Sequence, residues 1–107
     1  MEAKPRHLVH YVTADGRDLF ARWIETLVRS PALKKVLVRI DRAEDGNLGD
    51  WKAVGEGILE LRIDFATGYR IYCAEDGNDL VLLTGGTKET QDSDISTAKK
   101  YWRDYNA

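Results

Sequence analysis

A strict alternation of apolar and polar residues constrains the fold of this chain most strongly, and it spans residues 59–65, LELRIDF. A period of two places successive side chains on opposite faces of an extended strand, so one face is buried and the other is polar. Ala66-Thr67-Gly68 then provides a turn, and residues 69–74 are expected to form the returning strand. The chain therefore contains an antiparallel hairpin whose apolar face must pack against another layer.

Two helices are expected before this hairpin. Apolar residues recur at i, i+3, i+4 and i+7 within residues 17–29, and the same spacing returns within residues 31–44. Ser30-Pro31 between them is typical of a helix start, with serine as the N-cap and proline at the first helical position. Because this connection is very short, we expect the two helices to form an antiparallel hairpin.

Further strands and a last helix complete the prediction. Residues 7–13 are expected to form a first strand, residues 45–57 a glycine-rich loop, and residues 79–84 a hydrophobic central strand that Gly85-Gly86 ends. Helical spacing returns after Ser93 or Asp94, either of which can cap a C-terminal helix. Residues 1–107 are therefore expected to be one α+β domain. Its two N-terminal helices and its C-terminal helix pack on one face of a mostly antiparallel sheet of about four strands, and the other face is partly open.

Charge and composition exclude several classes of function. The 107 residues carry a net charge of −2, from 16 basic and 18 acidic side chains, which argues against a general polyelectrolyte binder of nucleic acid. One segment, residues 29–42, holds five cations and only one acid, and a solvated helix face is its simplest interpretation. Cys73 is the single cysteine, so no internal disulfide forms. No leader or membrane-spanning run is apparent, and we expect a cytoplasmic protein without membrane contact.

The polar face of the hairpin carries the candidate chemistry. If Ala66-Thr67-Gly68 is the whole loop, Asp64 lies opposite Arg70 and Arg62 lies opposite Tyr72, with Glu60 on the same face. Arginines bind phosphate with a planar fork, and a tyrosine can stack on a base or transfer protons. Lys88 could join them at the sheet edge. The alternative is that these charges form ordinary surface ion pairs, which contribute little to stability.

Metal or nucleotide chemistry has weaker support. His7 and His10 are three residues apart on a strand and so face opposite sides, and no metal site is expected. Gly85-Gly86-Thr87-Lys88 lacks the full spacing of a phosphate-binding loop. We therefore expect neither a metal nor any other cofactor.

Two long motifs carry a family resemblance, GNLGDWKAVGEGILELR over residues 46–62 and GGTKETQDSDI over residues 85–95. With them, the chain resembles the phage-derived, HigB-like "addiction module killer protein" branch of the RelE/ParE toxin superfamily, from the helix around Phe20 to Tyr101. The resemblance implies a RelE-like fold and the toxin of a type II toxin–antitoxin system. It also implies a cognate helix-turn-helix antitoxin, HigA-like and encoded beside the toxin, and growth arrest when the toxin is free.

The resemblance also implies a site. Many RelE-like members cut mRNA on the ribosome without a metal ion, with the 2′-hydroxyl as nucleophile and basic residues around the phosphate. Carried over by position, Arg62, Arg70, Tyr72 and Lys88 are the expected catalytic residues, and Lys52, Tyr69 and Lys99 the expected RNA contacts. This chain departs from the pattern because Ile58 and Glu60 stand where related toxins often carry lysines. A general base would then come from Glu60, Lys52, Tyr72 or Lys88.

Two other functions stay open. ParE-like members share the fold but bind and poison DNA gyrase, without being enzymes, and an acidic chain that lacks the strand lysines is compatible with that activity. A degenerate toxin could instead persist as an antitoxin-binding corepressor. In either case operator DNA would be contacted only through the antitoxin complex, whose antitoxin carries the groove-reading helix.

Overall fold

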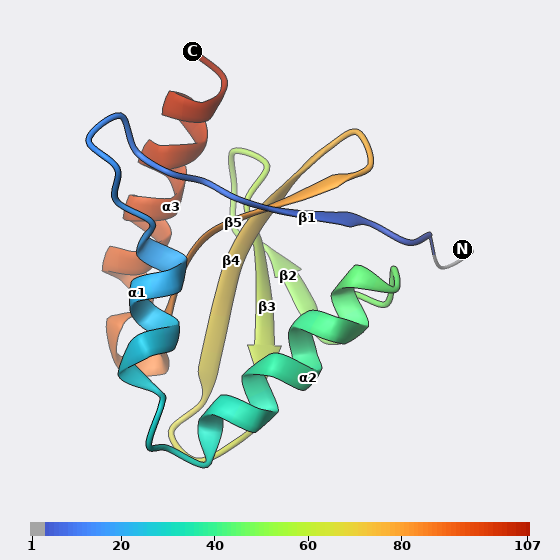
Figure 1. The fold of residues 1–107 in the computed structure, drawn as a ribbon, viewed down its shortest axis with the longest axis vertical. Coiled ribbons are helices and arrows are strands. Elements are labelled where there is room, and N and C mark those ends of the chain that lie inside the picture. Colours follow the sequence, from blue (N-terminus) through green and yellow to red (C-terminus); the bar gives the residue numbers. More distant parts are fainter. Residues whose placement is uncertain (1–3) are drawn as a thin grey trace.

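The computed structural model describes residues 4–107 and shows an α+β fold, as expected from the sequence (Figure 1). The five strands form one mixed sheet in the order β1-β5-β4-β3-β2, in which β1 runs parallel to β5 and the other pairs are antiparallel. The elements in chain order are β1 (His7–His10), α1 (Leu19–Thr26), α2 (Ala32–Glu44), β2 (Trp51–Ala53), β3 (Leu59–Ile63), β4 (Tyr69–Asp76), β5 (Asp79–Thr87), the short 3-10 helix η1 (Lys88–Thr90) and α3 (Gln91–Tyr105).

Helices cover both faces of the sheet, which corrects the prediction that all three lie on one face. α1 and α2 pack on the face that presents Leu61 and Ile71, whereas α3 packs on the face that presents Tyr72 and Leu83. The reason lies in β5, whose consecutive residues from Leu80 to Leu83 are all buried. A strand that is apolar on both faces requires a layer on each side.

α1 and α2 do not form the expected antiparallel hairpin. They diverge from their short connection (Figure 1), because α1 packs on β5 and α2 packs near β3. The second helix also starts one residue later than expected: α2 begins at Ala32 with Pro31 as its N-cap, and Ser30 Oγ accepts from the Ala32 backbone N–H at 3.1 Å one residue before that cap. α1 has a side-chain cap, because Asp18 accepts from the Ala21 N–H at 2.9 Å.

The central hairpin has a different register from the one predicted. Ile63 pairs with Tyr69 and Arg62 pairs with Arg70, so the loop holds residues 64–68 and Asp64 lies outside the strand. A shift of two residues keeps every side chain on its face. For that reason the predicted face, with Glu60, Arg62, Arg70 and Tyr72 together, survives the change of register.

Three other predicted boundaries were wrong. The expected loop 45–57 contains the edge strand β2, so the sheet has five strands. Gly85 and Gly86 do not end the last strand but lie inside β5. Both positions require glycine because the helices approach too closely for a side chain. A Cβ atom would overlap the Trp23 ring at Gly85 and the Asp94 carboxylate at Gly86. The last helix is preceded by η1 and begins at Gln91, before the two caps proposed for it. Within residues 4–107, no helix is long and apolar enough to cross a membrane.

Candidate functional site

A fully buried carboxylate, Glu60 of β3, lies at the centre of the candidate site. Its Oε2 atom accepts hydrogen bonds from the Tyr72 hydroxyl at 3.0 Å and from Gln91 Nε2 at 2.8 Å. Its Oε1 atom accepts from Arg62 Nε at 3.1 Å, and Arg70 Nε lies 3.6 Å from Oε2. Glu60 therefore joins β3, β4 and the start of α3, and it is the common partner of two arginines.

These contacts determine which groups near Glu60 carry charge. Burial raises the pKa of Glu60, but hydrogen bonds from Gln91, Arg62 and Tyr72 and the charge of Arg70 outweigh burial, so this pKa lies below its ordinary value. Burial, followed by the charge of Glu60, raises the pKa of Tyr72 far above its ordinary value. The site thus holds an ionised carboxylate and a neutral phenol at neutral pH.

The two arginines differ in how far they reach into solvent. The Arg70 side chain is only 12% exposed, whereas that of Arg62 is 35% exposed. Gly68 makes room for Arg70, because a Cβ atom on Gly68 would lie 3.2 Å from Arg70 Nη1 and its φ of +86° is strained for other residues. Arg62 is held by a hydrogen bond from Nε to Glu60, whereas Arg70 Nε is buried beside the same carboxylate at 3.6 Å without a hydrogen bond to it.

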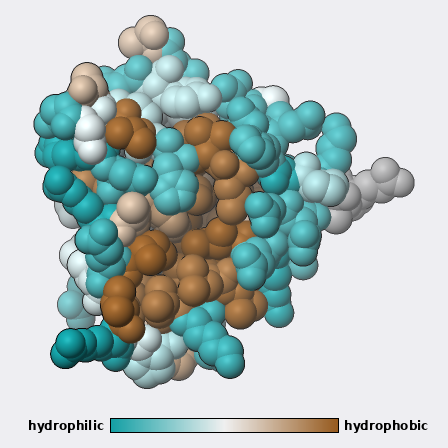
Figure 2. Space-filling view, in the orientation of Figure 1, coloured by the Kyte–Doolittle hydropathy of each residue, from teal (hydrophilic) through white to brown (hydrophobic). Residues whose placement is uncertain are grey.

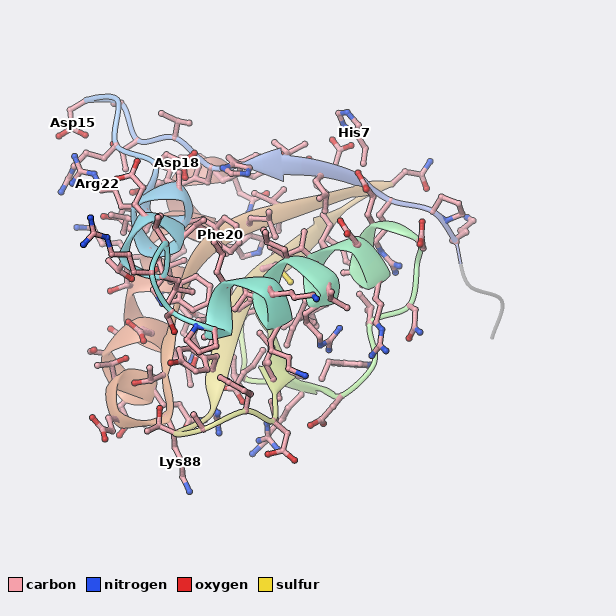
Figure 3. All side chains as sticks on the ribbon, turned by 60° about the horizontal axis from the view of Figure 1, so that its bottom comes forward. His7, Asp15, Asp18, Phe20, Arg22 and Lys88 are labelled. Carbon is pink, nitrogen blue, oxygen red and sulfur yellow. The ribbon has the colours of Figure 1, made fainter. Side chains whose placement is uncertain are left out.

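Arg62 and Arg70 line a pocket of ≈ 340 Å³ together with Lys88, and we call it the basic pocket. Lys88 follows β5 directly, and its backbone N–H donates to the Gly68 carbonyl at 3.1 Å, which holds the start of η1 against the hairpin loop. Its exposed side chain points away from the fold (Figure 3). Three cations around one small pocket can hold a tetrahedral anion such as phosphate. Asp50 and Asp64 also line this pocket.

The structure brings together some of the expected residues and separates others. Tyr72 lies beneath the basic pocket and is fully buried, so its ring is not accessible to a base. Tyr69 lies on the opposite face of the sheet, in the core with α1 and α2. Lys52 is exposed on β2, where it lies opposite Glu60 in the register of β2 and β3, while Lys99 of α3 lies near Gly55. None of these four residues lines the basic pocket.

Two functional residues were missed from the sequence. Gln91 donates to Glu60, and its place within the GGTKETQDSDI motif was the available signal. Arg39 of α2 is 6% exposed and donates from Nε to the Arg62 carbonyl at 3.1 Å and from Nη2 to the Asp50 carbonyl at 2.9 Å. Its spacing from the buried residue Val36 places it on the apolar face of the helix, where a charge indicates a specific partner.

Outside the basic pocket, the described residues form an apolar groove and no cluster of metal ligands. Apolar side chains gather where α1 and α2 diverge (Figure 2), around a groove of ≈ 420 Å³ lined by Leu8, Phe20, Ile24 and Leu37 among others. Among the residues that the structure describes, no group of three histidine, cysteine or carboxylate side chains is arranged to hold a metal ion.

Fold and site together define a class of protein: a small α+β domain with helices on both faces of a mixed sheet and a pocket lined by three cations and two carboxylates beside the buried Glu60. The family model "Phage derived protein Gp49-like (DUF891)" matches residues 22–103, and the chain belongs to this family, which is associated with toxin–antitoxin modules. The chain is also similar to an uncharacterized protein of Haemophilus influenzae, with 47% identity over 81 residues that cover 75% of this chain and 82% of the relative.

Proposed function

We propose that this protein is the toxin of a type II toxin–antitoxin module, of the HigB-like kind within the RelE/ParE superfamily, and that it cleaves mRNA on the ribosome. The observation that carries the proposal is the basic pocket, in which Arg62 and Arg70 share Glu60 and Lys88 is the third cation of the lining. Membership of a family associated with toxin–antitoxin modules supports the toxin role and an antitoxin partner, which we take to be a helix-turn-helix protein encoded beside the toxin.

In this proposal the pocket binds the scissile phosphate and stabilises the charge that develops on it. The 2′-oxygen of the preceding ribose forms a bond to phosphorus, its proton passes to solvent, and the bond from phosphorus to the 5′-oxygen breaks. Arg62 and Arg70 contact the non-bridging oxygens, which gain negative charge in the transition state. Lys88 offsets the negative charge on the departing 5′-oxygen, which takes up a proton from solvent. The products are a 2′,3′-cyclic phosphate and a 5′-hydroxyl end.

Glu60 and Tyr72 have a positioning role in the proposal. Glu60 is buried and accepts hydrogen bonds from Tyr72, Gln91 and Arg62, so it serves to orient the arginines rather than to remove a proton. Tyr72 acts through Glu60, whose carboxylate it fixes. Lys52, exposed beyond the basic pocket and paired with Glu60 across β2 and β3, is assigned a contact to the RNA backbone.

The test is Arg70→Ala in a growth assay, with Arg103→Ala as the matched control. Arg103 is 61% exposed on α3 and, within residues 4–107, pairs only with Glu56, away from the basic pocket, so its loss should leave toxicity unchanged. Loss of one charge-stabilising donor typically slows such chemistry by about 10²–10³-fold. We therefore expect folded Arg70→Ala protein to permit growth and to abolish new mRNA 5′ ends within coding regions.

Three results would contradict the proposal. Full toxicity in folded Arg70→Ala protein would remove this residue from the mechanism. Early arrest of DNA synthesis with intact mRNA after induction of the wild type would point to gyrase instead, and normal growth would point to a corepressor without toxic activity.

A further inference from the structure

We propose that a second groove, continuous with the basic pocket, holds the nucleotides of single-stranded RNA that flank the bound phosphate. The inference rests on the proposed function, because it assigns a place to the rest of the same RNA. The groove has a volume of ≈ 610 Å³ and lies between α2 and the end of β3, and we call it the α2 groove. Its helical wall carries four cations, Lys34, Lys35, Arg39 and Arg42.

The α2 groove and the basic pocket are parts of one surface. Both are lined by Asp50, Arg62, Ile63 and Asp64. The β2–β3 ladder ends at Leu61, where the Arg62 N–H donates to the Asp50 carbonyl at 2.9 Å, and the two sites meet around this end of β3. Arg62 lies at this junction and is partly exposed. An RNA strand bound along the α2 groove therefore passes Arg62 before the scissile phosphate reaches Arg70.

Arg39 holds the α2 groove in a fixed position relative to the basic pocket. Its guanidinium donates to the backbone carbonyls of Leu48, Asp50 and Arg62, and it is almost fully buried. These bonds tie α2 to the loop before β2 and to the end of β3. The cations on α2 are thereby kept beside the basic pocket rather than on a mobile helix.

The chemistry of the α2 groove fits single-stranded RNA. Cations on the helix face the phosphates, while Val38 and Phe65 provide apolar surface for the bases. Val38 is 46% exposed, and Lys35 Nζ lies 5.8 Å from the centre of the Phe65 ring. Single-strand sites combine a positive groove with such surfaces. An acidic protein segment would meet the same charges, but the continuity with a pocket whose three cations suit a phosphate favours RNA.

The experiment measures binding of 2′-O-methyl oligouridylates, which lack the nucleophile, by fluorescence anisotropy at several salt concentrations. Oligomers of about 4 and about 12 nucleotides bracket the site sizes of single-strand binders. The test variant is Lys34→Glu/Lys35→Glu, whose new acids lie in the first turn of α2, where they favour the helix. The matched control is Arg22→Glu/Lys100→Glu, which makes the same change in charge at exposed positions outside the groove.

We expect the groove variant to bind the longer oligomer about 20-fold more weakly at 0.1 M salt, since each phosphate contact on a single strand contributes a salt slope of about 0.7. The affinity of the groove variant for the short oligomer should change less than about twofold, and so should the affinities of the control variant for both oligomers. Arg70→Ala should instead weaken the binding of both oligomers. An equal loss of RNA affinity in the groove variant and the control would refute the role of the α2 groove without affecting the role of the basic pocket. So would loss of antitoxin binding without loss of RNA binding, since that result would assign the groove to a protein. Absence of Arg70-dependent binding to either oligomer would overturn the basic pocket as well.

Discussion

Replacing Glu60 by glutamine tests the arrangement at the centre of the site. The best placement of the new amide puts its oxygen at the Oε2 position, where it still accepts from Tyr72 and Gln91. Its NH₂ group then faces Arg62 Nε, so two donors meet and one charge-assisted hydrogen bond is lost. Arg70, which is 12% exposed, loses its only ion-pair partner among the described residues.

The expected cost follows from these losses. Removing one partner of a buried ion pair destabilises proteins by about 3–5 kcal/mol. The partial exposure of Arg62 and the two retained hydrogen bonds place Glu60→Gln at the lower end, at about 3 kcal/mol. For a domain of this size, that corresponds to a fall in the melting temperature of roughly 12–24 °C. Glu56→Gln removes an ion pair between half-exposed groups and should cost less than about 1 kcal/mol.

Urea unfolding followed by tryptophan fluorescence measures this difference, and its pH dependence gives an independent check. Because the pKa of Glu60 is lowered in the folded state, its charge contributes stability above the ordinary glutamate pKa of about 4.3. That contribution is lost as the pH falls through the lower folded-state pKa. The gap between wild type and Glu60→Gln should therefore narrow in acid. A gap below about 1 kcal/mol at neutral pH, or one that acid does not change, would refute the reasoning.

Three further predictions concern the packing around the site. Gly85→Ala should destabilise the fold by about 1–3 kcal/mol, because the new methyl group would overlap the Trp23 ring. Chemical denaturation measures this loss, and an unchanged free energy of unfolding would contradict the prediction. Burial raises the pKa of the Cys73 thiol to about 12, so native protein should resist alkylation at neutral pH while urea-unfolded protein reacts readily; rapid labelling of the folded state would contradict this. Arg39→Lys should cost about 1–3 kcal/mol, since one ammonium cannot reproduce bonds to three separate carbonyls, and an unchanged unfolding midpoint would argue against its anchoring role.

The sequence by itself determined the three helices, the strands other than β2, and the apolar and polar faces of the hairpin. The alternation through Glu60 and Arg62 placed these residues on one side, and Arg70 and Tyr72 joined them there. This assignment held although the predicted register was wrong, because a slip of two residues preserves the side of every side chain. Helical spacing likewise identified all three helices, with errors confined to their ends and caps.

Only the tertiary structure decided what covers that face and what lies beside it. α3 closes over Tyr72 and Glu60, which turns an expected surface tyrosine into a buried donor, and its first residue, Gln91, completes the carboxylate's partners. The α2 cations came to the edge of the basic pocket through Arg39, which binds carbonyls far along the chain. Local periodicity records which side of an element is apolar. It carries no information on which distant element covers that side, because such contacts depend on the packing of the whole chain.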